Sequence, residues 1–221
     1  MKKINVITID GPSASGKGAL SRKIAHNFGF DILDSGLLYR LYAYFSNKKL
    51  NFDEIPKKIN NEVSFKLNEE LVSVLHKKKD ITNKLRTEEI AKIASQMSAK
   101  SETRKPLFDI QRNFYTEGGL VADGRDMGTV VFQDAKLKIF LTASSEIRAK
   151  RRYLELQNLG QEVNMPALIA DIEERDLKDS SRKLSPLIPA DEAYVIDSSD
   201  MSLEEVFSFT ENIVKKEFIH I

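Results

Sequence analysis

The sequence predicts an α/β fold in which a five-stranded parallel sheet is flanked by helices. Short apolar runs rich in β-branched residues alternate along the chain with segments whose apolar residues follow helical spacing. Such alternation is typical of βαβ units with right-handed crossovers. The runs are nearly continuous in apolar residues, as expected of strands that are buried on both faces. A glycine-containing loop joins the first strand to the first helix, which is also typical of parallel sheets.

The composition excludes several classes of protein. The 221 residues include no cysteine, which excludes a disulfide scaffold, an iron–sulfur site, a cysteine zinc site and a thiol nucleophile. Lys and Arg total 34 and Asp and Glu total 33, so net charge predicts no attraction to nucleic acid or membranes. No apolar run approaches the roughly 20 residues that span a bilayer. We therefore expect a cytoplasmic monomer that binds neither nucleic acid nor membrane.

The first half of the chain predicts two strand–helix pairs. A strand at 4–9 runs into the loop 10–16, and a helix follows at 17–28. A second strand at 30–33 stops at Asp34-Ser35-Gly36 and leads into a helix at 37–47.

Residues 50–86 have a different character and predict a small antiparallel insertion. Strands at 63–67 and 71–75 would form a hairpin around the turn 68–70. The lysine run 77–79 is interpreted as a solvated loop tip. The rest of the chain, 1–49 and 87–221, would form the core.

The second half predicts the remaining strands and helices. Gly118 and Gly119 would end the second of two helices that precede the third strand. The predicted helices are 87–99, 102–117, 144 or 145 to 158, 165–179 and 203–217, and the predicted strands are 120–122, 138–141 and 193–196.

A phosphate-binding loop is the strongest local signal. The segment Gly11-Pro12-Ser13-Ala14-Ser15-Gly16-Lys17 fits G-x-x-x-x-G-K, follows a strand and opens a helix, which is the context that supports the motif. Successive backbone N–H groups curl around phosphate oxygens, and the helix N-terminus adds partial positive charge. Lys17 would supply a mobile cation for the β- and γ-phosphates.

The residues after the loop bear on metal binding and on the class of nucleotide protein. Gly18 stands where many nucleotide hydrolases have the Ser or Thr that holds Mg²⁺, and Ala19 follows it. Metal would then be held through water, with Asp10 and Asp123 as candidates at strand ends. A guanine-reading N-K-x-D is missing, since the nearest match at 83–86 has Arg86 in the carboxylate position, and we discount a GTPase.

Cations from later segments converge on the same edge of the predicted sheet. Ligands of parallel α/β sheets bind outside the carboxyl ends of the strands. Arg40 lies about one turn into its helix, and residues 123–128 follow the third strand. Two late helices carry Arg148, Arg151, Arg152, Arg175, Lys178 and Arg182. Phosphoryl transfer needs such cations, and an arginine-bearing helical hairpin can close as a lid.

These blocks together resemble the bacterial cytidylate kinase family over almost the whole chain. The most specific block is 122–132, Ala-Asp-Gly-Arg-Asp-Met-Gly-Thr-Val-Val-Phe. The other matching blocks are 9–13, 16–18, 34–36, 39–40, 86–87, 94–96, 138–141, 143–145, 174–176 and 186–187.

The resemblance implies a P-loop NTPase-type core of five parallel strands, a helical lid at about 148–185 and a nucleoside monophosphate-binding insertion at 50–86. It also implies ATP-dependent, Mg²⁺-assisted phosphorylation of CMP and dCMP to CDP and dCDP. No general base is expected, since the attacking phosphate oxygen is already ionised at neutral pH.

The resemblance also implies roles for individual residues. Ser95, Arg104 and Asp126 resemble the cytosine readers, and Ser35 resembles a residue of the same binding face. Arg175 and Asp179 resemble the sugar contacts. The residues that resemble the ATP-phosphate site are Gly11, Pro12, Ser13, Ala14, Ser15, Gly16, Lys17, Gly18, Ala19 and Arg151. Those that resemble the phosphate clamps and catalytic cations are Lys17, Arg40, Arg125, Arg175 and Arg182.

The chain departs from the family pattern at a few positions. Ala14 replaces the usual Gly inside the loop, and Ala19 replaces the Thr after it. Lys178 and Ser180 stand where the family commonly carries further arginines. We expect activity with a lower affinity for ATP. Two alternatives are another P-loop kinase of small phosphates, such as a uridylate or adenylate kinase, and a regulator that binds ATP without transferring phosphate.

Overall fold

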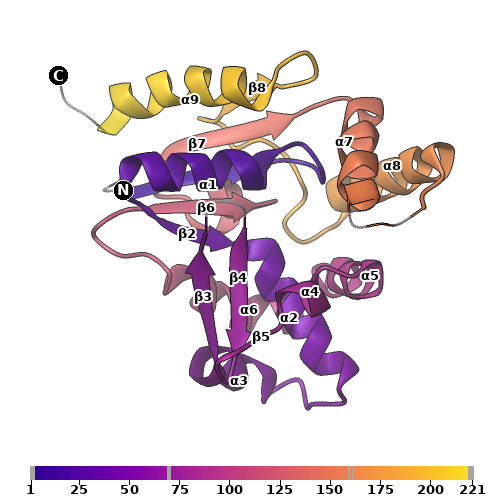
Figure 1. Cartoon of the computed structure of the whole chain (residues 1–221). Helices are drawn as coiled ribbons and strands as arrows, with labels where there is room; N and C mark the ends of the chain where they lie inside the picture. The colour runs from indigo at the N-terminus through magenta and orange to yellow at the C-terminus, as the bar shows by residue number, and fades with distance from the viewer. Residues whose placement is uncertain (1–2, 69–70, 159, 161, 219–221) are drawn as a thin grey trace.

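The computed structural model describes residues 3–68, 71–158, 160 and 162–218. Within these residues, one sheet holds five parallel strands in the order β2-β6-β1-β7-β8 (Figure 1). The strands are β1 (Ile4–Asp10), β2 (Asp31–Asp34), β6 (Leu120–Gly124), β7 (Ala135–Thr142) and β8 (Tyr194–Asp197). The α/β class and the parallel sheet predicted from the sequence are confirmed.

Helices cover both faces of this sheet (Figure 1). Helices α1 (Lys17–Phe28) and α9 (Leu203–Phe218) pack on one face, with Ile7 and Ile9 of β1 beneath them. Helices α2 (Ser35–Asn47) and α6 (Ser101–Arg112) pack on the other face, where β1 contributes Val6. Because β1 is buried on both sides from Val6 onward, its sequence is mostly apolar and lacks the regular alternation of a half-exposed strand.

A second, antiparallel sheet packs against α2. It consists of β3 (Val63–Leu67), β4 (Val72–His76) and β5 (Lys79–Asp80), with the short helices α3 (Ile55–Glu62) and α4 (Thr82–Leu85) beside it. The hairpin predicted at 63–67 and 71–75 is confirmed, with the second strand one residue later. Residues 69 and 70 of its turn lie outside the described residues. Lys77 and Lys78 form the exposed turn between β4 and β5, as expected.

Two predictions about local structure are wrong. The helix predicted at 102–117 ends at Arg112, well before Gly118 and Gly119. Beyond Arg112, the N–H groups of Phe114 and Tyr115 donate hydrogen bonds to carbonyl oxygens three residues earlier. Both aromatic side chains pack against the core. Burial of these rings therefore takes precedence over continuation of the helix. The helix α3 and the π-helix η1 (Met127–Val131) were not predicted at all.

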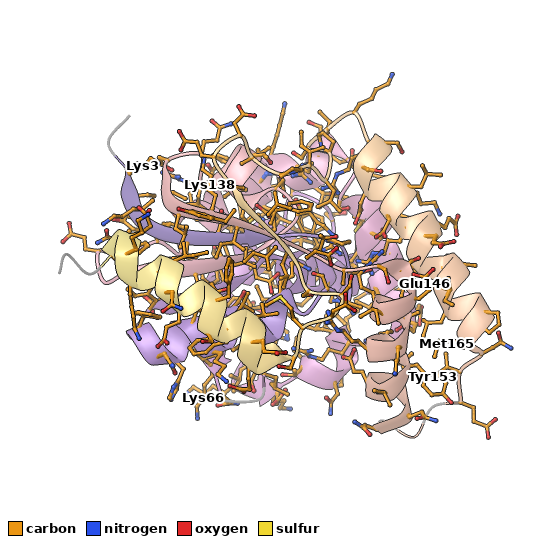
Figure 2. All side chains as sticks on the ribbon, turned by 90° about the horizontal axis from the view of Figure 1, so that it is seen from above. Lys3, Lys66, Lys138, Glu146, Tyr153 and Met165 are labelled. Atoms are coloured by element: carbon orange, nitrogen blue, oxygen red, sulfur yellow. The ribbon has the colours of Figure 1, made fainter. Side chains whose placement is uncertain are left out.

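The remaining helices lie toward one end of the molecule. Helices α5 (Glu88–Met97), α7 (Ser145–Asn158) and α8 (Met165–Ser181) complete the description. Helices α7 and α8 lie side by side, and Figure 2 shows Tyr153 of α7 near Met165 at the start of α8. Among the described residues, the helices are too short or too polar to cross a bilayer. The functional division into core, insertion and lid stays a prediction.

Truncation of a buried ring in α2 is expected to destabilise the fold strongly. Phe45 is 1 % exposed and stacks edge-on against His76, so Phe45→Ala would leave a cavity between α2 and the second sheet. We expect a loss of about 3–5 kcal/mol in the free energy of unfolding, measured by urea denaturation. The control is Phe209→Ala, because Phe209 is 51 % exposed and its truncation should cost less than about 0.5 kcal/mol. Equal losses in the two variants would contradict this assignment of the core.

Candidate functional site

Three carboxylates meet where neighbouring parallel strands end. Asp10 ends β1 opposite Gly124 of β6, and Asp34 ends β2 opposite Asp123. Asp34 also begins α2, since its Oδ1 accepts a hydrogen bond of 3.1 Å from the backbone N–H of Leu37. The register therefore places these side chains at one edge of the sheet, where parallel α/β proteins bind ligands.

The phosphate loop has the backbone of an anion-binding turn. Gly11 and Gly16 have φ values of 151° and 96°, and a Cβ at Gly11 would collide with the carbonyl oxygen of Leu141. Gly16 directly precedes α1, so the free N–H groups of the first helical turn face the loop. Lys17 lies back across the loop and donates a 3.1 Å hydrogen bond to the carbonyl oxygen of Pro12. The loop is therefore formed and closed by its own lysine.

The buried position of Lys17 changes its pKa and that of its neighbour. Burial, reinforced by the positive charge of Arg125, lowers the pKa of Lys17 to about 8. Burial raises the pKa of Asp123 to about 6, although Lys17 opposes the shift from 4.0 Å. An anion bound in the loop would stabilise the charged lysine, because opposite charges favour ionisation. The site is therefore electrostatically incomplete without an anion.

The two residues after the loop lysine lie in different surroundings. A Cβ at Gly18 would lie 3.4 Å from both Asp123 Oδ2 and Arg22 Nη1, so this position faces the carboxylate edge. Ala19 instead lines a cavity of about 1420 Å³ between α1 and the second sheet, together with Leu67 and Thr82. The predicted consequence of Ala19 for ATP affinity stays a prediction.

Three arginines from two segments surround one buried carboxylate. Asp179 of α8 accepts a 2.9 Å hydrogen bond from Arg125 Nε, and its other oxygen lies 3.6 Å from Arg182 Nη1. Arg175 lies in the same cluster, where burial and Arg125 lower its pKa to about 10. Within the described residues, Arg175 Nε and Arg182 Nη2 are buried without a hydrogen-bond partner. Buried donors of this kind can bind phosphate oxygens.

Arg40 reaches this region from α2. Its Nη1 donates a 2.8 Å hydrogen bond to the carbonyl oxygen of Leu85, at the end of α4. Burial lowers the pKa of Arg40, while Asp34 opposes the shift. Arg40 thus links α2 to the second sheet and leaves most of its donors for other partners.

A second cluster joins Arg104 and Asp126. The two side chains form a buried ion pair, and Arg104 Nη1 also donates to the carbonyl oxygen of Ser98 at 2.9 Å. The ring of Tyr39 lies 5.8 Å from the Arg104 guanidinium carbon. A cavity of about 310 Å³ opens beside this pair, and its lining includes Tyr39, Arg104, Phe108, Gln111 and Val131. That volume is large enough for a small ring system.

The two predicted serines differ in how firmly they are held. Ser35 is buried, and its Oγ accepts a 2.8 Å hydrogen bond from Gln111 Nε2, which leaves its own proton for another acceptor. Ser95 is half-buried on α5, and its carbonyl oxygen accepts from Ser98 Oγ at 2.8 Å. Arg182 Nη1 also lies 3.4 Å from Ser98 Oγ, so Ser98 links the two arginine clusters.

The arginines of α7 hold the phosphate loop from outside. Arg151 Nη1 donates to the carbonyl oxygen of Ser15 at 3.0 Å, and its Nη2 donates to the carbonyl oxygen of Ser198 at 2.7 Å. Arg148 is 4 % exposed, pairs with Asp176 of α8 and lies 3.4 Å from the carbonyl oxygen of Ser13. Both arginines therefore hold carbonyl groups on the outer side of the loop. The N–H groups of the loop are left facing its inner side.

Three residues of this arrangement were not assigned from the sequence. Arg148 was recognised only as one of several arginines on a helix face, and its burial distinguishes it. Ser98 and Gln111 contact Arg182 and Ser35, which are distant in sequence, and no local pattern identifies them.

Asp10 and Asp123 differ as possible metal ligands. Each oxygen of Asp10 accepts a 2.8 Å hydrogen bond from a backbone N–H, that of Met127 or that of Gly128. Burial raises the pKa of Asp10 to about 7, although these two bonds oppose the shift. Asp123 lies beside Gly18 and Lys17 and makes no such pair of bonds. The described residues contain no group of three or more His, Cys, Asp or Glu side chains suited to binding a metal alone.

A glycine-containing loop between a central parallel strand and a helix, closed by lysine and surrounded by arginines, defines the class of P-loop proteins that bind nucleotide phosphates. The sequence model of the family described as cytidylate kinase matches residues 7–216. The chain belongs to the cytidylate kinase family.

Individual relatives agree with this assignment. The chain is 42% identical to the cytidylate kinase of Acinetobacter baylyi over 219 residues, which cover 96% of each protein. It is 47% identical to the cytidylate kinase of Marinomonas over 207 residues, which cover 91% of each. A crystal structure of an uncharacterised protein from Eubacterium ventriosum matches 97% of this chain and 99% of its own, with a TM-score of 0.51 and 12% identity. That structural match supports the fold alone.

Ala14 carries a conformational strain that glycine would relieve. Its φ of 58° lies in the left-handed region, where an L-residue is destabilised by about 1–2 kcal/mol. Glycine avoids this strain, but ordering its more flexible backbone on folding costs about 0.5–1 kcal/mol more than ordering alanine. We expect Ala14→Gly to increase the free energy of unfolding by about 0.5–1 kcal/mol. The control is Ala170→Gly on the exposed side of α8, which should lower it by about 1 kcal/mol. Destabilisation in both variants would contradict the assignment of strain to Ala14.

The charge on Asp179 should make stability depend on pH. Burial alone would raise its pKa, but Arg125, Arg175 and Arg182 outweigh burial and hold the pKa below its usual value. Such a carboxylate stabilises the fold above its unfolded pKa of about 3.9 and loses this contribution as the pH falls. We expect Asp179→Asn to be about 1–3 kcal/mol less stable than the wild type at neutral pH, with the difference shrinking below about pH 4. Urea denaturation across this range measures the difference.

The exposed Asp109 provides the control for this measurement. Asp109→Asn makes the same chemical change on α6, away from the arginine cluster, and should leave the free energy of unfolding nearly unchanged. If the loss of unfolding free energy in Asp179→Asn stayed constant with pH, the arginine cluster would depend on the shape of the side chain and not on its charge.

Proposed function

We propose that this protein transfers the terminal phosphoryl group of ATP to CMP and dCMP, yielding CDP or dCDP and ADP. Membership in the cytidylate kinase family supports the reaction. The observation that carries the choice of acceptor is the buried Arg104–Asp126 pair beside a cavity large enough for a base. The cavity and the phosphate loop are linked by the turn that carries both Arg125 and Asp126.

The chemistry of cytosine suits this pair. Its exocyclic amine is a hydrogen-bond donor and would bind the Asp126 carboxylate, while its N3 and O2 are acceptors and would bind Arg104. In this structure the two side chains bind each other, and Arg104 lines the cavity beside them. Uracil presents an acceptor in place of the amine, and the carboxylate would repel it. Ser95 and Ser35 would complete the base and sugar contacts.

Transfer requires alignment and charge neutralisation more than proton transfer. A phosphate monoester has its second pKa near 6, so the attacking oxygen of CMP is already ionised at neutral pH. The loop 11–17 would hold the β- and γ-phosphates of ATP. Lys17 would stabilise the negative charge that develops on the transferred phosphoryl group. Arg40, Arg125, Arg175 and Arg182 would bind the acceptor phosphate and the transferred group.

The lid would complete this site from the other side. Helix α8 carries Arg175 and Asp179, and Arg182 follows it directly. Closure of α7 and α8 over the phosphates would exclude water and bring the free donors of Arg175 and Arg182 onto the transferred oxygens. Asp179, once released from Arg125, would be available to the sugar hydroxyls.

Mg²⁺ fits the carboxylate edge beside the loop. Asp123 is buried there with a raised pKa, which indicates that its charge is undercompensated in the absence of a cation. Asp123 would hold the ion through water, and the phosphates would supply further oxygen ligands. When bound, the metal would supply positive charge that neutralises part of the phosphate charge. Asp10 is less suited, because backbone N–H groups occupy both of its oxygens.

The substrate panel and one variant test this function. With ATP and Mg²⁺, the wild type should form diphosphates from CMP and dCMP far faster than from UMP, AMP or GMP. Asp126→Ala should lower kcat/KM for CMP by about 10- to 100-fold, since it removes a charged hydrogen bond. The dissociation constant of ATP should stay within about twofold, measured by calorimetry.

Asp109→Ala is the matched control, because it removes an exposed carboxylate from the same region without touching the cavity. Preferred use of another monophosphate by the wild type would keep the kinase chemistry but contradict the roles of Arg104 and Asp126. ATP binding without turnover of any of the five acceptors would favour a nucleotide-binding regulator.

A further inference from the structure

Asp10 binds two successive backbone amides with its two carboxylate oxygens. Oδ1 accepts from the N–H of Met127 and Oδ2 accepts from the N–H of Gly128, both at 2.8 Å. The side chain is 4 % exposed and lies at the carboxyl end of β1, immediately before the phosphate loop. A buried carboxylate with both oxygens used in this way has a partner that is fixed in position.

The bonded amides belong to the turn that leaves β6. Arg125 and Asp126 immediately precede Met127, and the carbonyl oxygen of Asp126 accepts from Val130 N and Val131 N at 2.9 and 3.2 Å. The turn thus continues at once into the π-helix η1, an irregular element that often occurs at functional sites. The backbone hydrogen bonds of Val130, Val131 and Phe132 are local to the turn and the π-helix, whereas the two bonds from Asp10 connect the turn to the end of β1.

The turn also packs directly onto β1. A Cβ at Gly128 would lie 2.8 Å from Thr8 Oγ1 and 3.4 Å from Asp10 Oδ2, so only glycine allows this close approach. Side chains from the same turn then diverge: Arg125 binds Asp179 of the lid, and Asp126 binds Arg104. A shift of the turn would therefore move both groups together.

We propose that Asp10 is a positioning residue that sets selectivity for the acceptor base by fixing the turn that carries Arg125 and Asp126. The proposal rests on the proposed function, because it takes Asp126 as the reader of the base. Asp10 does not contact the base itself, and it acts only through the backbone of Met127 and Gly128.

The ATP side of the site should be much less sensitive to this residue. The backbone of Asp10 is fixed by pairing with Gly124 and Phe140 on either side, independently of its carboxylate. The loop carbonyls of Ser13 and Ser15 lie against Arg148 and Arg151, and not against Asp10. Loss of the carboxylate should therefore separate acceptor recognition from donor binding.

Asp10→Asn is the decisive variant, because an amide can accept from only one of the two backbone N–H groups. We expect kcat/KM for CMP and the CMP-to-UMP selectivity ratio each to fall by about 10- to 100-fold, as displacement of reacting groups by a fraction of an ångström does. KM for ATP should stay within about twofold. Hydrogen exchange at the amides of Met127 and Gly128 should become faster, which reports the lost bonds without any substrate.

Two comparisons distinguish positioning from a general loss of stability. Glu205→Gln is the control, because Glu205 accepts a backbone N–H bond from Ser202 at 2.8 Å on an exposed part of α9, outside the proposed site. It should leave CMP selectivity unchanged. In the double variant Asp10→Asn/Asp126→Ala, selectivity should fall no further than in Asp126→Ala alone, because both changes act through one reader.

Several results would overturn the proposal. They are an unchanged CMP-to-UMP ratio in Asp10→Asn, a rise in KM for ATP as large as the loss toward CMP, or additive losses in the double variant. If Asp10→Asn does not fold, Gly128→Ala displaces the same turn and must show the same split between CMP and ATP. If the wild type prefers another monophosphate, the proposed function fails. The effect of Asp10→Asn on the selectivity ratio for that preferred acceptor then tests the positioning role of Asp10 independently.

Discussion

Burial of many charges at one edge of a parallel sheet is the constraint on which the rest of this structure depends. Ionised groups removed from water are costly unless opposite charges or hydrogen bonds compensate them. The fold compensates them mostly in pairs drawn from separate segments: Lys17 with Asp123, Arg104 with Asp126, Arg125 with Asp179, and Arg148 with Asp176. The local pair of Arg182 with Asp179 adds to these. The pairs between segments join helices and turns to one another and to the sheet edge, so electrostatic compensation and tertiary structure are established together.

The compensation leaves an excess of positive charge. In the described residues, buried guanidinium nitrogens of Arg22, Arg86, Arg175 and Arg182 have no hydrogen-bond partner, and the pKa values of Lys17 and Arg175 are lowered. Phosphates would supply the missing negative charge. The site is thus prepared for a ligand with several anionic oxygens, and binding such a ligand would relieve an unfavourable interaction that is already present.

The sequence predicted the parts of the site that are local and could not predict those that depend on tertiary contact. The loop 11–17 and the turn 123–128 were identified because each is one continuous segment at a strand end, where glycines and charges recur at fixed spacing. Gln111 binds Ser35 and Ser98 binds Arg182, both far away in sequence, and serine and glutamine are common on any helix surface.

The errors in the fold have the same origin. The helix α6 stops at Arg112 because two aromatic rings behind it pack into the core, and helical spacing up to Gly118 contains no sign of that packing. Asp10 is a possible metal ligand by its place at a strand end, and that assignment stays a prediction. The two backbone amides that it binds could be known only once β1 and the turn after β6 lie side by side.

One turn connects two buried ion pairs. Arg125 and Asp126 are consecutive, yet one binds Asp179 of α8 and the other binds Arg104 of α6. Neighbouring residues of a short turn are coupled through the backbone, so a displacement of the Arg125 guanidinium would also displace the Asp126 carboxylate. Under the proposed function, a base that fits poorly against Asp126 would therefore also misplace Arg125 at the phosphates. Selectivity would then be expressed in the rate of transfer as well as in binding, without a separate step of recognition.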